Sequence, residues 1–242
     1  MKTRIFALLL AVICVLTLAS CKKDTAASLY ADSLKAVEEA GGMEANVSMK
    51  ISAEFGGETE TMDMEMKMKS NGDNMYIFMD EVEMTYVDGV MYTKMGDIKT
   101  KETISLDAFK KDYGSMLTTV DFPELSEEVL KDIELVEDGE NRSFTVTLDA
   151  ATMQSYVDKI MSGLMGGSDE DMPNIKISSI VLTPTFDKDG NMTKMNMKME
   201  ISYEMEMIGE MKMGMDMTFT LVNIGTAPTI TAPADADSYT AD

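Results

Sequence analysis

The sequence predicts an α+β protein built on one curved antiparallel sheet with helices on one face. The main observation is an alternation of apolar and polar residues, as in TMDMEMKMKS at 61–70, which predicts strands with one apolar and one hydrated face. Turn signals such as Gly56-Gly57 and Asp88-Gly89 join these segments directly, which favours antiparallel neighbours over βαβ units. No linker-like segment divides the chain, so we expect one domain.

The first twenty residues have the features of a secretory signal peptide. Lys2 and Arg4 precede an apolar run over 5–18 that is too short for a convincing membrane span. The tetrapeptide LASC at 18–21 then resembles a bacterial lipobox. This resemblance implies cleavage before Cys21 and a diacylglyceryl group on its sulfur, and two acyl chains suffice for stable membrane anchoring. The alternative is an ordinary cleaved signal that leaves an unmodified cysteine.

The first half of the remaining chain predicts a helix followed by a strand meander. Residues 25–40 place apolar side chains at helical spacing, and two glycines follow. From Met43 the period changes to two, which predicts a strand to residue 55 with its odd positions apolar. The strand after the glycine turn carries its methionines on the same kind of apolar face, and shorter strands are expected over 75–95.

The middle of the chain is mixed. Ser105 is expected to cap a short helix. Residues 133–137 are expected to pair with 143–148 across a turn. Asp149 is then expected to cap a second helix, in which Tyr156 and Ile160 face inward.

The C-terminal third returns to strands. A strand over 175–186 leads through the turn sequence DKDGN into a row of methionines at odd positions from 195 to 207. A turn at Gly209-Glu210 then precedes a last strand with Met211, Met213, Met215 and Met217 in phase. The turn sequence resembles the start of a calcium loop, but its glycine is misplaced and no glutamate closes it, so a hairpin is expected.

The chain contains 27 methionines, and their alternation leaves three interpretations open. Methionine is flexible and adapts to varied apolar partners, which suits a ligand cavity. The same residues would also fill an ordinary core. A third interpretation is Cu(I) binding by the thioethers, since soft sulfur ligands select that ion. The rows continue in phase into valine, isoleucine and phenylalanine, which favours core or cavity over copper.

Composition excludes several functions. The chain has 43 acidic and 21 basic residues and a formal net charge of −22, which argues against a nucleic-acid partner. It contains no histidine, the commonest general base, and no recognisable nucleophile turn or phosphate loop. We therefore expect a protein that is not an enzyme and that uses neither a cofactor nor a metal. The sequence defines no protein partner.

The order of elements resembles LolA-like bacterial lipoproteins. The likeness follows the lipobox and helix in three stretches, MYIFMDEVEMTYVDGVMYTKMG at 75–96, TLDAATMQSYVDKIM at 147–161 and ITAPADADSY at 230–239. Similar families include LolA and LolB, the mycobacterial LppX and LprG lipoproteins and, closest in pattern, uncharacterised Gram-positive surface lipoproteins. The resemblance implies a half-barrel sheet with helices over its concave face and space for acyl chains between them.

Together these observations predict a signal peptide at 1–20, a lipidated tether at 21–28 and a single LolA-like domain at 29–242. The expected function is an extracytoplasmic lipoprotein, anchored to the bacterial cell membrane through Cys21, that binds a hydrophobic ligand such as lipid acyl chains. The alternatives are a structural or interaction lipoprotein with a filled methionine-rich core, and Cu(I) binding. The predicted ligand-cavity residues are Met62, Met64, Met66, Met68, Met195, Met197, Met199, Met213, Met215, Met217, Tyr156 and Ile160.

Overall fold

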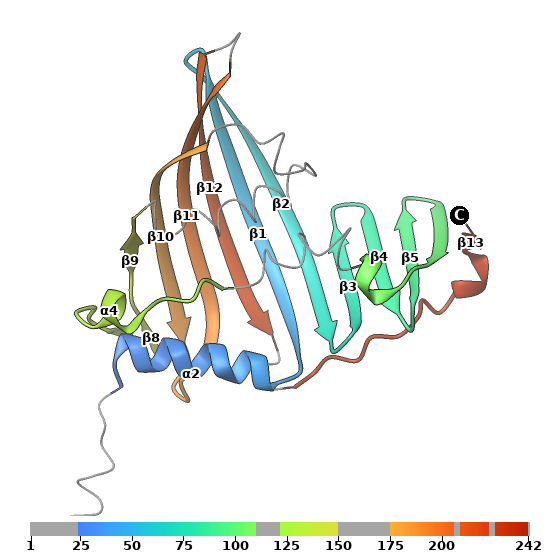
Figure 1. The fold of residues 1–242 in the computed structure, drawn as a ribbon, viewed down its shortest axis with the longest axis horizontal. Helices are drawn as coiled ribbons and strands as arrows, with labels where there is room; N and C mark the ends of the chain where they lie inside the picture. Colours follow the sequence, from blue (N-terminus) through green and yellow to red (C-terminus); the bar gives the residue numbers. More distant parts are fainter. Residues whose placement is uncertain (1–23, 110–121, 150–174, 206–208, 223–225, 242) are drawn as a thin grey trace, which may run out of the picture.

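One large antiparallel sheet dominates the computed structural model, which describes residues 24–109, 122–149, 175–205, 209–222 and 226–241 (Figure 1). The elements in chain order are α2 (Ala26–Glu39), β1 (Gly42–Phe55), β2 (Glu58–Asn71), β3 (Asn74–Met79), β4 (Val82–Val87), β5 (Val90–Met95), β6 (Ile98–Thr103), α4 (Glu127–Leu130), β7 (Val136–Asp138), β8 (Asn141–Ser143), β9 (Val146–Leu148), β10 (Ile175–Phe186), β11 (Met192–Met205), β12 (Gly209–Val222), the 3-10 helix η2 (Ala236–Ser238) and β13 (Thr240–Ala241).

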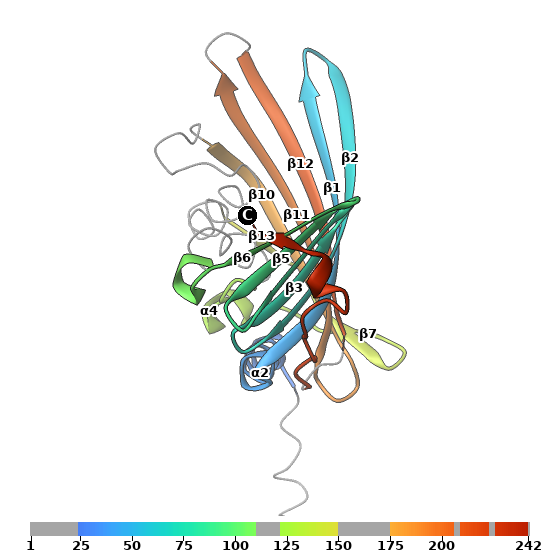
Figure 2. The same cartoon turned by 90° about the vertical axis from the view of Figure 1, so that its right-hand side faces the viewer.

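Within the described ranges the strands follow the order β13-β6-β5-β4-β3-β2-β1-β12-β11-β10-β8-β7, and β9 also pairs with β10. Every pairing is antiparallel except the short parallel contact of β13 with β6. The sheet is open and curved (Figure 2). The prediction of a curved antiparallel sheet is therefore confirmed. The helix predicted after Asp149, which was expected to cover the concave face, lies outside the described residues.

The alternating sequence produces the two faces of this sheet. In β1 the side chains of Ala45, Val47 and Met49 are buried, whereas Ser48 and Lys50 between them are exposed. The register continues this alternation from strand to strand, because residues directly opposite each other point to the same face. We call the face that carries the buried odd-numbered residues of β1 the inner face, and the opposite one the outer face.

Helix α2 closes one end of the long strands, which we call the base (Figure 1). Thr25 caps the helix and forms a capping box with Ser28. Its buried Tyr30 donates a hydrogen bond to the Pro123 carbonyl oxygen at 2.7 Å, and Ser33 donates one to the Gly190 carbonyl oxygen at 2.7 Å. The opposite end of the sheet, beyond the β1–β2 turn at Gly56-Gly57, is the tip.

Two local predictions were wrong. Residues 143–148 do not all pair with β7, because β8 does so while Val146 and Leu148 turn onto β10 and bury their side chains opposite Leu182 and Ile180. The second concerns Gly209 and Glu210, which belong to β12 and pair with β11 instead of forming a turn. In the first place the predicted turn forms but the hairpin is shorter than expected, and in the second the turn is replaced by a strand; in both, pairing with a neighbouring long strand outweighs the local pattern.

The turn at the base is a hydrogen-bonded hairpin, as the sequence predicted. The Asp187 carboxylate accepts hydrogen bonds from the backbone N–H groups of Asp189 and Asn191, both at 2.9 Å, and from the Asn191 side chain. Burial raises the pKa of Asp187, but these hydrogen bonds outweigh it and the pKa lies below its usual value. The carboxylate form is therefore favoured in the folded protein.

Asp187→Ala is expected to lower the free energy of unfolding by about 1 to 2 kcal/mol, because it leaves the turn donors without their acceptor. For a group with a lowered pKa, this contribution is present above the unfolded-state pKa and disappears as the pH falls through the folded-state value. Urea unfolding at pH 7 and at pH 2 should therefore show a larger loss at pH 7 than at pH 2. Asp189→Ala is the matched control, since among the described residues its exposed side chain pairs with Lys188 alone. Equal effects of the two substitutions would contradict this role for Asp187.

The C-terminal residues 226–241 form a strap along the β3–β6 meander (Figure 1). Asn71 donates a hydrogen bond to the Pro228 carbonyl oxygen at 2.7 Å, and the Lys99 Nζ lies 2.5 Å from an Asp235 carboxylate oxygen. The buried Tyr239 ring packs edge-on against Tyr92 with ring centroids 5.4 Å apart. Because the strap pairs with β6, it covers backbone groups that would otherwise form an open sheet edge.

Docking of the strap is expected to weaken at acidic pH. The hydrogen bond from Lys99 lowers the pKa of Asp235, so the carboxylate stabilises the docked strap above its unfolded-state pKa of about 3.9. That stabilisation is lost as the pH falls through the lower folded-state value. The amide NMR signals of Thr240 and Ala241 should therefore move toward unstructured positions on titration from pH 5 to pH 2. Asp235→Asn should abolish this transition, and a wild-type strap that shows no acid transition would contradict the prediction.

Candidate apolar binding surface

The predicted methionines form rows across the inner face. One row runs Met64, Met49, Met217, Met197 and Leu182 over five neighbouring strands, each residue being the direct register partner of the next. Parallel rows contain Met62, Ile51, Met215, Met199 and Ile180 on one side and Met66, Val47, Phe219, Met195 and Pro184 on the other. Directly opposed side chains lie about 5 Å apart at Cβ. The strand phase predicted from the sequence thus produces a continuous apolar surface.

Burial divides the predicted lining into two groups. A buried group, the deep methionines, is at most 3% exposed and consists of Met68, Met195, Met197, Met199, Met215 and Met217. These residues pack in one core cluster with Phe144, Phe186, Phe219 and Tyr30. Met64, Met66 and Met213 are half-buried against the same cluster, whereas Met62 is 58% exposed. The apolar face is therefore filled over β10, β11 and β12 and accessible mainly on β2, where Met62 lies in the same row as the buried Met215 and Met199.

A second accessible row, which the sequence did not assign to the site, crosses the meander. We call it the rim row: starting from Met66 on β2, it continues through register partners on four further strands, namely Met79, Val82, Met95 and Ile98. Met95 is 52% and Ile98 is 60% exposed, and the others are half-buried. The short strands were predicted, but only their register shows that these side chains continue the inner face.

Three predicted residues cannot be placed. Cys21, Tyr156 and Ile160 lie outside the described residues. The ten predicted methionines all lie on described strands and carry apolar thioethers. Among the described residues no group of three or more histidine, cysteine, aspartate or glutamate side chains is arranged to hold a metal ion. The accessible part of the inner face is therefore suited to contact with apolar surface.

Within the same described ranges, no helix is sufficiently long and apolar to cross a membrane. The elements that form the site are strands, and their apolar side chains alternate with exposed polar ones such as Asp63, Glu65 and Lys67 on β2. The polar outer face of this part of the sheet is in contact with water, whereas its inner face is apolar.

The fold and this inner face define a class of open curved-sheet proteins with one apolar concave face. The chain belongs to DUF6612, a family of unknown function whose model matches residues 31–240. A search of curated proteins finds no match.

Several solved structures resemble the chain. LprF from Mycobacterium bovis is 17% identical over 86% of this chain and 96% of its own, with a TM-score of 0.38. A LolA superfamily protein from Nitrosomonas europaea is 9% identical over 83% and 94%, with a TM-score of 0.27. A domain from Vibrio parahaemolyticus, named for outer membrane lipoprotein sorting, is 10% identical over 80% and 91%, with a TM-score of 0.20.

Proposed function

We propose that this protein is a lipid-anchored extracytoplasmic protein that binds a hydrophobic ligand, such as lipid acyl chains, on the accessible part of its inner face. The observation that carries the proposal is the exposure of Met62, Met95 and Ile98 at 58%, 52% and 60% on one face of one sheet. Soluble proteins rarely expose large contiguous apolar patches unless these bind something. The half-buried Met64 and Met66 connect the two exposed regions.

Affinity would come from burial of apolar surface, worth about 25 cal/mol per Å². Methionine side chains suit this role because their unbranched thioethers adjust to acyl chains of different length and shape. No covalent chemistry is required, and we propose a binding function without catalysis.

The anchor would place the site away from the membrane. Cys21 lies three residues before Asp24, so an acylated Cys21 would hold Asp24 within about 11 Å of the bilayer surface. Asp24 forms an ion pair with Arg142 of β8 beside α2. The base would therefore lie next to the membrane, and the accessible methionines would face away from it.

Native mass spectrometry tests the ligand directly. The chain from residue 22 onward would be purified from bacteria, and co-purified molecules would be extracted into organic solvent. We expect a bound mass in the lipid range that disappears on extraction. A fully apo protein that also fails to take up added fatty acid would contradict the proposed function. Globomycin treatment and metabolic labelling with palmitate would test acylation at Cys21 separately.

A second function is favoured by the deep methionines. Their burial in one cluster with four aromatic residues supports a filled core, and hence a structural or interaction lipoprotein. Heating with and without fatty acid separates the two functions, because a ligand that binds only the folded state must raise the melting temperature. A rise in Tm that grows with ligand concentration favours the binding function.

A further inference from the structure

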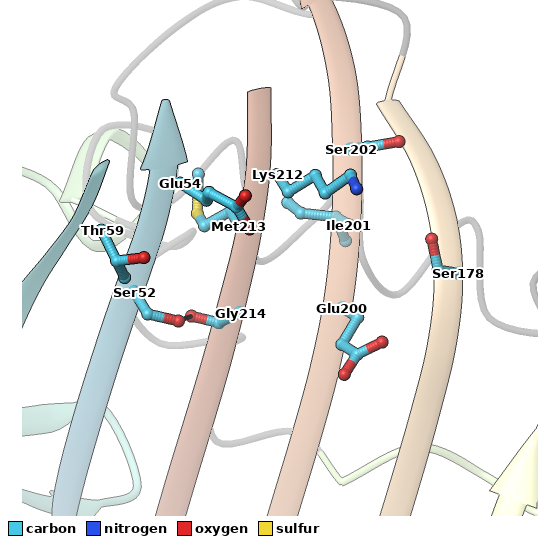
Figure 3. Close-up of a pocket in the computed structure, with 10 residues that line it drawn as sticks. All are labelled: Ser52, Glu54, Thr59, Ser178, Glu200, Ile201, Ser202, Lys212, Met213 and Gly214. Atoms are coloured by element: carbon cyan, nitrogen blue, oxygen red, sulfur yellow. Dashed lines mark hydrogen bonds between the residues drawn. The ribbon is translucent and has the colours of Figure 1, made fainter. Parts of the chain in front are cut away.

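A pocket lies where two hairpins separate near the tip. The pairing of β1 with β12 ends at Glu54 and Lys212, whereas β11 and β12 continue to pair as far as Met205 and Gly209. Beyond that point the β1–β2 and β11–β12 hairpins diverge (Figure 2). We call the hollow at this point the fork pocket. It has a volume of about 330 Å³ and is lined by Ser52, Glu54, Thr59, Ser178, Glu200, Ile201, Ser202, Lys212, Met213 and Gly214 (Figure 3).

Gly214 creates space at the centre of the pocket. It occupies an outer-face position between Ser52 of β1 and Glu200 of β11, its two register partners. A Cβ atom at this position would lie 2.7 Å from the Ser52 Oγ, so a larger residue would displace that side chain. The MKMGMDM sequence therefore interrupts the outer row of side chains at one position and leaves a hollow there.

Several polar groups of the pocket have no partner among the described residues. Ser202 is 8% exposed, and among the described residues its hydroxyl has no hydrogen-bond partner. Within those same residues the charged groups of Glu54, Glu200 and Lys212 take part in no ion pair. By contrast, the neighbouring Lys198 on the same face pairs with Asp216 at 3.3 Å. A buried hydroxyl is normally hydrogen-bonded, so Ser202 points to a polar ligand that would occupy this hollow.

The fork pocket also borders the apolar inner face. Ile201 and Met213 are register partners that belong to the inner-face rows, and both line the pocket. Met213 was part of the lining predicted from the sequence, and here it separates the polar pocket from the methionine surface. Because β1 and β12 no longer pair beyond Glu54 and Lys212, an amphiphile could place its polar end among the charged residues of the outer face and pass its apolar part between the two hairpins to Met213 on the inner face.

We propose that the fork pocket binds the zwitterionic headgroup of an amphiphile, with its anionic group on Lys212 and its cationic group on Glu54 and Glu200. This inference rests on the proposed function, since the inner face would hold the apolar part. Two carboxylates and one ammonium line the pocket, so a purely anionic headgroup would meet net repulsion. The hydroxyls of Ser52, Thr59, Ser178 and Ser202 supply further hydrogen bonds. The volume accommodates a headgroup but not a whole lipid.

Isothermal titration calorimetry tests the pocket with four probes. These are dihexanoylphosphatidylethanolamine, its anionic phosphatidylglycerol counterpart, O-phosphoethanolamine as the headgroup alone, and laurate as the apolar chain alone. All described contacts lie within residues 24–241, so the chain from residue 22 onward retains them. The zwitterionic lipid should bind at least about tenfold more tightly than the anionic one, the ratio expected from one charge-assisted hydrogen bond. Equal affinity for the two lipids would overturn the proposal.

Two substitutions locate the headgroup. Lys212→Gln and Glu200→Gln should each lower the affinity for the zwitterionic lipid by about tenfold or more and leave the affinity for laurate unchanged. Lys198→Gln is the matched control, because it removes a lysine from the same face outside the pocket and should leave both affinities unchanged. Zwitterionic binding that is unaffected by Lys212→Gln and Glu200→Gln would overturn the inference, provided that thermal unfolding shows all variants folded.

The probes separate this inference from the proposed function. If laurate binds but Lys212→Gln and Glu200→Gln leave the affinity for the zwitterionic lipid unchanged, headgroup binding in the fork pocket is contradicted and the proposed function is not. If neither laurate nor either lipid binds, the proposed function is contradicted, and so is the proposal that the ligand is an amphiphile. O-phosphoethanolamine could also bind as tightly as the whole lipid, with an affinity that Lys212→Gln lowers. This result would show that the pocket binds a free zwitterionic solute and would overturn the proposal of an amphiphile.

Discussion

Met217→Ala is expected to lower the free energy of unfolding by about 2 to 5 kcal/mol, whereas Met62→Ala should change it by less than about 0.5 kcal/mol. The two methionines occupy neighbouring rows of the inner face, but Met217 is 0% exposed and Met62 is 58% exposed. Removing a fully buried side chain forfeits its transfer free energy and leaves a cavity. Removing an exposed side chain forfeits little transfer free energy and leaves no cavity. Urea unfolding followed by circular dichroism measures both values.

This pair of variants decides how far the filled core extends. A loss below about 1 kcal/mol for Met217→Ala would mean that its surroundings are loosely packed, and the ligand cavity predicted from the sequence would then reach the deep methionines. In that case added fatty acid should restore stability to the variant by occupying the space. Met197→Ala, at the register partner of Met217, serves as a repeat in the same row.

The double variant Met62→Gln/Met95→Gln is expected to weaken fatty-acid binding by about tenfold to a hundredfold while shifting Tm by only a few degrees. Both side chains are more than half exposed, so about half of each remains available for burial against a ligand. Burial against a ligand would contribute about 1.5 to 3 kcal/mol in total, and glutamine of similar shape forfeits it. Fluorescence titration with a fatty-acid analogue measures the affinity.

Phe78→Gln is the control for that experiment. Phe78 is 37% exposed on β3, but its neighbours Ile77 and Met79 point to the inner face, so Phe78 points to the outer one. It removes an exposed apolar side chain from the opposite side of the same sheet and should leave affinity unchanged. Weakening by Phe78→Gln equal to that of the double variant would indicate nonspecific binding and contradict an inner-face site.

The proposed orientation connects these sites. If Cys21 carries acyl chains, the base with α2 lies near the membrane and the fork pocket lies at the far end of the long strands. A ligand would then enter from the side opposite the anchoring membrane. Depth-dependent quenching of probes attached at Lys188 in the base hairpin and at Thr59 near the tip would test this arrangement, with quenching expected only at the base.

The sequence by itself determined the phase of the long strands and several of their turns, although not the pairing of 143–148 or the position of the turn between β11 and β12. Alternation with a period of two requires that Met62, Met64, Met66 and Met68 share one face of β2, and the structure confirms this. Turn chemistry was equally informative at Asp88-Gly89, where both residues adopt positive φ, as a two-residue hairpin turn requires. These features depend on neighbours in the chain, so they can be derived from local sequence.

Only the tertiary structure decided which of these equivalent residues are accessible. Met62 and Met217 have the same residue type and the same phase, yet their exposures differ because Met62 lies on β2 outside the core cluster, whereas Met217 lies on β12 within it. The rim row and the fork pocket likewise depend on register across several strands and on where two hairpins separate. Burial is set by contacts between residues far apart in the chain, and a periodic pattern carries no information about them.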